Sequence, residues 1–409
     1  MTIRKTRPML AAFILLALTG CGASVPLPAA SDSAATGHGA IAGVAEAPEP
    51  QLHLVAVDAA GGASMLDLLD GTETRLGSVA APLEATSDGR YVFAAGPTGV
   101  EIIDSGVWTW DHGDHFHYYR AEPALLGTVA GGGVAAVASG PLSTTGTTGL
   151  FFPSSGTAVL LDNAALSDGT ISQTLRLDVA PHPGIIAPLG GGAVVTEADG
   201  GGTAARLRAI DAAGKELTTA QCPAAAGTIT TRAGLVIGCA DGAVIATTDG
   251  TVPVLEHVPY PAGAAAPATS FAGRKGRPTV AGLGTDAGVW LLNTREREWD
   301  WLPTGAPVLA AAAVDDDAGH VVVVGGDGTV QVYDATTKER LSSAGPLMPA
   351  TLASPELADS VELTVDGQRA YVSAPAEGVV FEIDYADGAR VARTLSLPTR
   401  PVHLAETGR

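Results

Sequence analysis

The sequence predicts an all-β protein folded as a single β-propeller, with eight blades favoured and seven as the alternative if one repeat is a false match. Three observations lead to this prediction: a short strand motif recurs along the chain, glycine is abundant, and each end of the folded region reads as half of one sheet. The 52 glycines and 27 prolines among 409 residues disfavour long helices and favour many tight turns.

The recurring motif is a short apolar strand that closes with aspartate or asparagine. Asp-Gly turns and a further strand precede several copies, and Asp-Gly between apolar strands is a strong hairpin signal. Four short strands in each repeat of this length are typical of a propeller blade. The copies close on average about 45 residues apart, at Asp70, Asp104, Asp162, Asp211, Asp249, Asn293, Asp334 and Asp384.

The two ends of residues 51–409 are expected to meet in one blade. Pro401–Thr407 reads as an innermost strand with no blade after it, and Leu52–Asp58 reads as a second strand with no first strand before it. Pairing them would complete a blade and remove an open sheet edge. Residues 51–409 are therefore expected to form one propeller domain, closed by its N- and C-terminal strands.

The N-terminus carries an export signal. Basic residues precede Met9–Leu18, an apolar stretch too short to span a bilayer permanently. The run from Leu18 to Cys21 resembles the lipobox of bacterial lipoproteins, so residues 1–20 are expected to be a lipoprotein signal peptide and Cys21 to carry lipid. The alternative is an ordinary secretory signal with a chance cysteine.

Residues 21–50 are expected to be a flexible tether, because they are rich in Ala, Ser, Pro and Gly and lack periodicity. The expected location is extracytoplasmic, anchored to the cell membrane by lipid at Cys21. Asp and Glu number 43 against 23 Lys and Arg, a formal charge of -20, which argues against a nucleic-acid partner.

The two remaining cysteines are expected to form a disulfide. Cys222 and Cys239 flank a hairpin expected over 228–231 and 235–238, and export implies an oxidising compartment. Two free buried thiols are the alternative. The sequence contains no C-x-x-C pair, which would indicate a redox or zinc motif.

Three of the nine histidines lie within the six residues from His112 to His117. On an extended strand, His115 and His117 project from the same face, on which two side chains can reach one metal ion. His112 and Asp114 supply further ligand types from the preceding turn. Imidazole and carboxylate groups suit zinc, which takes about four ligands. The alternative is that these histidines fill space among the surrounding aromatic side chains.

His182 and His403 each start a predicted innermost strand. In a propeller such positions converge around one mouth of the central channel, with Glu406 nearby, and propeller binding sites commonly arise there. The alternative is that each histidine is a hydrogen-bonded structural residue.

The segment Asp111–Tyr119, followed by Arg120–Pro123, resembles the signature of the AztD-type zinc metallochaperones, which are extracytoplasmic β-propellers associated with a zinc ABC importer. Further similarities are Pro181-His182, the Cys222/Cys239 pair and the closing Pro401–Gly408. The resemblance implies zinc as cargo and direct transfer of zinc to the solute-binding protein of the importer.

The chain departs from the family pattern at four places. In the family pattern, further histidines occur near the positions of Ala135, Ala136 and Ala226, which are alanines in this chain. The family pattern also has a histidine-rich arm near the N-terminus, where this chain has only His38. These departures imply weaker zinc binding, fewer zinc sites or a changed role for this chain.

The function predicted from these patterns is zinc transfer without enzymatic activity. The candidate zinc ligands are His112, Asp114, His115, His117, His182, His403 and Glu406. The alternatives are a metal-dependent hydrolase or lactonase and a propeller that binds only proteins. The sequence contains neither a G-x-S-x-G nor an H-E-x-x-H motif.

Overall fold

A computed structural model describes residues 44–111, 113, 115–250, 252–264, 266–284 and 287–409. The predicted signal peptide, Cys21, most of the predicted tether, His112 and Asp114 lie outside the described residues. The described part is all-β, as predicted, with eight four-stranded antiparallel sheets, one three-stranded sheet and three short helices. No helix in these ranges is long and apolar enough to cross a membrane.

The four-stranded sheets follow one another along the chain and are numbered here in that order. Sheet 1 contains β35 (His403–Thr407), β2 (His53–Val57), β3 (Gly62–Asp67) and β4 (Glu73–Ser78). Sheet 2 contains β5 (Glu84–Ser87), β6 (Tyr91–Gly96), β7 (Gly99–Asp104) and β10 (Ala124–Ala130). Sheet 3 contains β11 (Ala136–Ser139), β12 (Thr147–Phe152), β13 (Thr157–Asp162) and β14 (Gln173–Asp178). Sheet 4 contains β15 (Ile186–Leu189), β16 (Gly192–Ala198), β17 (Ala204–Ile210) and β18 (Glu216–Gln221).

The second half of the chain repeats this arrangement. Sheet 5 contains β19 (Ala226–Thr231), β20 (Gly234–Cys239), β21 (Gly242–Thr247) and β22 (Val254–Pro259). Sheet 6 contains β23 (Ser270–Ala272), β24 (Thr279–Leu283), β25 (Gly288–Asn293) and β26 (Glu298–Pro303). Sheet 7 contains β27 (Val308–Ala313), β28 (His320–Gly325), β29 (Val330–Asp334) and β30 (Arg340–Ala344). Sheet 8 contains β31 (Leu363–Val365), β32 (Ala370–Ala374), β33 (Val379–Asp384) and β34 (Arg390–Ser396).

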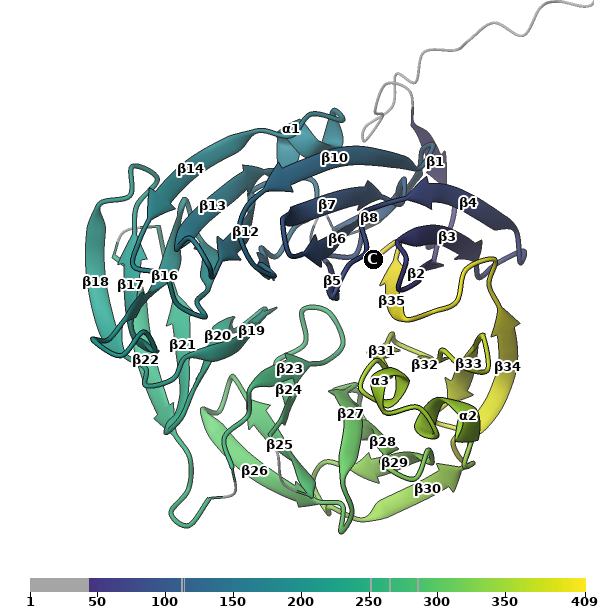
Figure 1. The fold of residues 1–409 in the computed structure, drawn as a ribbon. Helices are drawn as coiled ribbons and strands as arrows, with labels where there is room; N and C mark the ends of the chain where they lie inside the picture. Colours follow the sequence, from purple (N-terminus) through teal and green to yellow (C-terminus); the bar gives the residue numbers. More distant parts are fainter. Residues whose placement is uncertain (1–43, 112, 114, 251, 265, 285–286) are drawn as a thin grey trace, which may run out of the picture. The chain divides into compact units, whose positions relative to one another are not determined.

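The three helices lie in loops between strands: α1 (Asn163–Ser167), α2 (Pro349–Leu352) and α3 (Pro355–Ala358). Figure 1 shows the eight sheets following one another around a common centre, with β5, β19, β23, β27, β31 and β35 on the inner side.

The recurring motif coincides with one position in every sheet. Each of its eight copies overlaps the third strand, from β3 in sheet 1 to β33 in sheet 8. The closing side chain has a local role, because an Asx oxygen readily accepts a main-chain hydrogen bond in a turn. Six closing residues accept a hydrogen bond from the N–H two residues further along: Asp70, Asp104, Asp162, Asp211, Asn293 and Asp334. In these six copies the closing residue therefore makes the same local hydrogen bond to the main chain.

The apolar core is divided among the interfaces between neighbouring sheets. Among the described residues there are eight buried clusters, and each draws its side chains mainly from two consecutive sheets. In one of them Phe93 of sheet 2 packs with Phe152 of sheet 3. In another, Leu54 of sheet 1 packs with Tyr371 of sheet 8. No sheet has a core of its own, because successive side chains along a strand face opposite neighbours.

The first and last parts of the described chain meet in sheet 1. Strand β35 pairs antiparallel with β2, with His403 opposite Val57 and Thr407 opposite His53. This is the strand pairing that the sequence predicted for Pro401–Thr407 and Leu52–Asp58.

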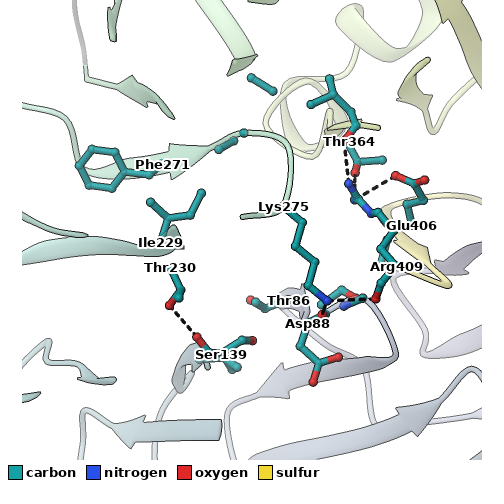
Figure 2. A pocket seen from close by; sticks show the side chains of 18 of the residues that line it. Thr86, Asp88, Ser139, Ile229, Thr230, Phe271, Lys275, Thr364, Glu406 and Arg409 are labelled. Carbon is teal, nitrogen blue, oxygen red and sulfur yellow. Dashed lines mark hydrogen bonds and ion pairs between the residues drawn. The ribbon is translucent and has the colours of Figure 1, made fainter. Parts of the chain in front are cut away.

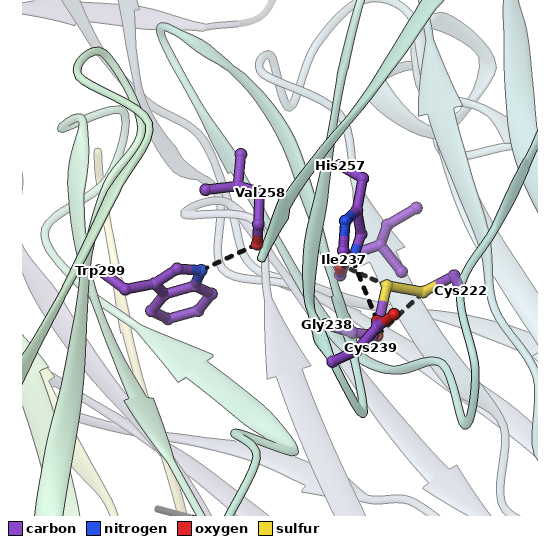
Figure 3. The surroundings of a disulfide bond; sticks show 8 residues. Cys222, Ile237, Gly238, Cys239, His257, Val258 and Trp299 are labelled. Atoms are coloured by element: carbon purple, nitrogen blue, oxygen red, sulfur yellow. Dashed lines mark hydrogen bonds and ion pairs between the residues drawn. A yellow bond between two sulfur atoms is a disulfide. The ribbon is translucent and has the colours of Figure 1, made fainter. Parts of the chain in front are cut away.

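The predicted disulfide between Cys222 and Cys239 is present. Cys239 ends β20, and Cys222 directly follows β18, so the bond ties sheet 5 to the end of sheet 4, as Figure 3 shows. Both cysteines are fully buried in the apolar cluster between these sheets. The alternative of two free thiols is therefore wrong for this structure.

Candidate metal site

The segment that carries the clustered histidines forms a separate small sheet. Strands β8 (Val107–Asp111) and β9 (Phe116–Arg120) form a hairpin inserted between β7 and β10 of sheet 2, and β1 (Ala45–Ala47) adds a third strand along β9. We call this three-stranded sheet the histidine sheet. Strand β1 differs from the prediction for residues 21–50, since the last part of that stretch contains a β-strand rather than a tether.

One face of the histidine sheet is lined by aromatic side chains. Trp108 lies opposite Tyr119, and Trp110 lies opposite His117, in the antiparallel register of β8 and β9. Trp108 stacks on Tyr119 with ring centroids 5.0 Å apart, and Tyr119 stacks on His117 at 6.1 Å. The imidazole of His117 therefore belongs to a packed row of rings, which restricts its orientation.

A buried ion pair supports the base of this row. The Arg90 guanidinium lies over the Trp108 ring, 3.9 Å from its centroid, and donates to both carboxylate oxygens of Asp104 at 3.0 and 2.7 Å. Arg90 and Asp104 both belong to sheet 2 and are buried. The bidentate geometry and the cation–π contact hold the histidine sheet against that sheet.

His115 and His117 are brought together, as the two-residue spacing predicted. Their Nε2 atoms lie 2.9 Å apart, and the ring centroids lie 4.7 Å apart. Two imidazole nitrogens that bind one tetrahedral zinc ion at 2.0–2.1 Å lie about 3.3 Å apart, so small rotations would let both rings ligate the same ion. His117 is buried and His115 is exposed.

Glu46 completes this arrangement from β1. Its Oε1 lies 2.5 Å from Nδ1 of His117, so Nδ1 faces the carboxylate and Nε2 faces His115. A carboxylate on the second ring nitrogen is the usual outer partner of a metal-binding histidine. Sequence reasoning missed Glu46, because β1 is only three residues long and lies in an Ala-rich stretch without periodicity.

His182 lies in a different setting. Its Nδ1 lies 2.7 Å from the main-chain oxygen of Ala180, and its Nε2 lies 2.9 Å from Oγ1 of Thr196. The ring is buried and meets Phe151 edge-on at 4.8 Å. Both nitrogens of His182 are thus engaged by residues of its own surroundings.

His403 and Glu406 lie on opposite sides of β35, because residues three apart on a strand project from different faces. His403 Nδ1 lies 3.2 Å from Oε1 of Glu362, and Oε2 of Glu362 accepts the N–H of Leu404 at 2.7 Å. Burial raises the pKa of Glu362. Among the described residues, the hydrogen bonds of His403 and His182 go to different partners, and none joins His403 to His182 or to Glu406.

Glu406 faces a cavity of about 370 Å³ at the centre of the sheets. Figure 2 shows its carboxylate beside the Arg409 guanidinium, and the two groups form an ion pair at 2.9 Å. From the opposite wall, Lys275 Nζ donates to the main-chain oxygens of Asp88 at 2.7 Å and Arg409 at 3.0 Å. Burial raises the pKa of Glu406 to about 8.

Of the sequence-predicted ligands that lie in the described ranges, only His115 and His117 contact each other. Within those ranges, no group of three or more His, Cys, Asp or Glu side chains is arranged to hold a metal ion. His112 and Asp114, which precede β9 in the sequence, lie outside them. The described geometry thus brings together two imidazoles and one carboxylate.

The chain is similar in sequence and in fold to a known protein. No protein-family model matches it. The zinc chaperone AztD of Citrobacter koseri is 28% identical to it over 216 residues, a match that covers 48% of this chain and 48% of that protein. The sequence match thus spans about half the length of this curated relative.

The structural comparison extends further along the chain. The crystal structure of Citrobacter koseri AztD superposes with a TM-score of 0.77 at 20% identity, covering 88% of this chain and 98% of that one. The dihydro-heme d1 dehydrogenase NirN superposes with a TM-score of 0.56 at 16% identity, covering 88% and 75% of the two chains. These similarities show that the fold is a β-propeller.

Proposed function

We propose that this protein is an extracytoplasmic zinc metallochaperone of the AztD type. It binds a zinc ion through His115 and His117 and passes the ion to the solute-binding protein of a zinc ABC importer. The observation that carries the proposal is the 2.9 Å approach of the two Nε2 atoms on one face of the histidine sheet. The sequence signature around these histidines and the name of the similar zinc chaperone support it.

The proposed zinc site is completed by residues that precede β9 in the sequence. Zinc in proteins takes about four N, O or S ligands, and His112 and Asp114 are the proposed remaining ligands. His182, His403 and Glu406 are left out of this site. The hydrogen bonds of His182 and the separate surroundings of His403 and Glu406 support structural roles for them.

Transfer is proposed to run by ligand exchange, in which ligands of the partner replace those of this chain one at a time. This requires no catalytic base, so no enzymatic activity is proposed. The exposed His115 is the ligand that an incoming group reaches first, while His117 is held by its packed row of rings. The formal charge of -20 favours the accumulation of cations near the surface.

The fold is proposed to be a closed propeller of eight blades, one for each four-stranded sheet. Two observations support closure: β35 pairs with β2, and the apolar cluster shared by sheets 8 and 1 resembles those between the other neighbours. The lipid anchor at Cys21 remains a proposal that rests on the lipobox resemblance alone. It would keep the propeller at the outer side of the cell membrane.

The zinc site is tested by titrating the metal-free protein with zinc in competition with a chromophoric chelator, alongside measured metal content per chain. About one zinc per chain is expected, and His115→Ala/His117→Ala should abolish it. His257→Ala is the matched control, because that histidine is also partly exposed and paired with a carboxylate, Asp241 at 3.0 Å. Fewer than about 0.2 zinc ions bound per chain, or zinc binding unchanged by the double substitution, would contradict the proposed site.

A further inference from the structure

Strand β1 is attached to the rest of the protein by few contacts. Within the part of the chain that the structure describes, it pairs only with β9, with Ala45 opposite Arg120, Glu46 opposite Tyr119 and Ala47 opposite Tyr118. Its residues are exposed or half-buried, so little apolar surface is removed from water when it docks. A three-residue edge strand of this kind is expected to dock and undock readily.

A side-chain contact from β1 to the histidines is specific. Glu46 lies opposite Tyr119, which places its side chain diagonally across from His117 on the same face. The carboxylate meets Nδ1 of His117 at 2.5 Å. The Glu46 side chain is 48% exposed, whereas that of His117 is 9% exposed. The histidine is therefore held in a packed environment, while its carboxylate partner comes from a short edge strand.

We infer that Glu46 is a positioning residue for the zinc site and that docking of β1 and zinc occupancy reinforce each other. The inference rests on the proposed function, because it concerns the same two histidines. By holding a proton on Nδ1, Glu46 keeps Nε2 of His117 available to a metal ion and makes it a stronger donor. Zinc on Nε2 in turn strengthens the hydrogen bond from Nδ1 to Glu46.

The coupling is reciprocal, because both effects belong to one thermodynamic cycle. If docked β1 raises zinc affinity by a given factor, bound zinc favours the docked strand by the same factor. Anything that draws β1 away from β9 then weakens zinc binding. The first strand of the described chain is thus a release element for the ion.

The first experiment measures zinc affinity by chelator competition in the intact protein, in Glu46→Ala and in Glu49→Ala. Glu49 lies three residues further on and is exposed, so it controls for the lost charge. Removing an outer-shell partner typically lowers metal affinity 10- to 100-fold, which is the loss expected for Glu46→Ala. In a His117→Ala background, Glu46→Ala should have no further effect.

The second experiment measures amide hydrogen exchange at Ala45–Ala47 with and without saturating zinc. In the unchanged protein, zinc should slow amide exchange at these residues by the same factor by which Glu46→Ala lowers zinc affinity. In His117→Ala, zinc should leave the exchange rate unchanged. Zinc X-ray absorption should show the same coordination number in Glu46→Gln as in the unchanged protein. A lost oxygen ligand would mean that Glu46 binds zinc directly and would overturn the positioning role.

Failure of this inference is distinguishable from failure of the proposed function. If the unchanged protein binds no zinc, or binds it equally well without His115 and His117, the proposed function fails. If zinc binding depends on both histidines while Glu46→Ala matches Glu49→Ala and exchange at 45–47 ignores zinc, only the coupling through β1 is wrong.

Discussion

His117 and His403 are both buried imidazoles on β-strands, and each faces a glutamate from a different strand or loop. His117 is 8% exposed and His403 is 7% exposed. Nδ1 of His117 lies 2.5 Å from Glu46, and Nδ1 of His403 lies 3.2 Å from Glu362. Viewed from the Nδ1 side alone, the two sites have the same chemistry.

The difference lies in what else each pair contacts. Nε2 of His117 meets a second imidazole, that of His115. Glu362 is also committed to the main-chain N–H of Leu404, which ties the His403 pair into sheet 1. A histidine–carboxylate pair therefore suggests a metal site only where a second candidate ligand faces the other ring nitrogen of the histidine, Nε2. Without that ligand, the pair is a buried polar contact that stabilises the fold.

The largest expected difference between the two regions is in zinc affinity. His117→Ala should weaken binding by about 100-fold or more, because it removes one of the two adjacent imidazoles of the proposed zinc site. His403→Ala should change binding by less than about twofold, because His403 lies outside that proposed site. Chelator competition measures both. Equal losses for the two variants would show that His403 belongs to the zinc site and would break the comparison.

Stability without metal should differ in the opposite sense. His403→Ala leaves the largely enclosed carboxyl group of Glu362 without its side-chain partner, which should cost about 1–3 kcal/mol. His117→Ala should lower the free energy of unfolding by less, because the Glu46 carboxylate is half exposed and can hydrogen-bond to water instead. Urea unfolding of the two metal-free variants, at the same pH, tests the order. A larger loss for His117→Ala would contradict it.

A graded effect of pH on stability is expected from Glu406, on the same strand as His403. Its pKa in the folded protein is raised to about 8 from an ordinary value of 4.5. Between these two values the folded state binds more protons than the unfolded state, so stability should fall as the pH rises through this window. The contribution is at most about 1.4 kcal/mol per pH unit. It is fully present below pH 4.5 and lost above about 8.

Thermal unfolding of the metal-free protein from pH 5 to 8 measures this slope, and Glu406→Gln should flatten it. The matched Glu46→Gln variant should keep the slope, since no comparable burial affects Glu46. If Glu406→Gln leaves the pH dependence unchanged, the raised pKa of Glu406 does not govern stability in this range.

Much of the fold could be predicted because its signals are local and repeated. The strand motif recurs eight times, and six of its closing side chains accept a hydrogen bond from the main-chain N–H two residues further on. The approach of His115 to His117 followed from the period of a β-strand alone. Cys222 and Cys239 flanked a recognisable hairpin.

The missed or misplaced residues depend on contacts that no local pattern encodes. Glu46 meets His117 across 71 positions of sequence, from a strand too short to give a periodic signal. Glu362 reaches His403 from 41 positions away. The expected convergence of His403 and Glu406 overlooked their spacing, since residues three apart on one strand face opposite sides.

The insertion point of the histidine sheet has a practical consequence. Asp104, where β7 ends, and Ala124, where β10 begins, lie directly opposite each other in sheet 2. The chain therefore leaves this sheet and returns to it at the same rung, and residues 105–123 occupy the place of an ordinary turn. A segment with adjoining ends can be exchanged as a cassette: a short loop could replace it here, and the hairpin could be transplanted between two antiparallel strands of an unrelated scaffold.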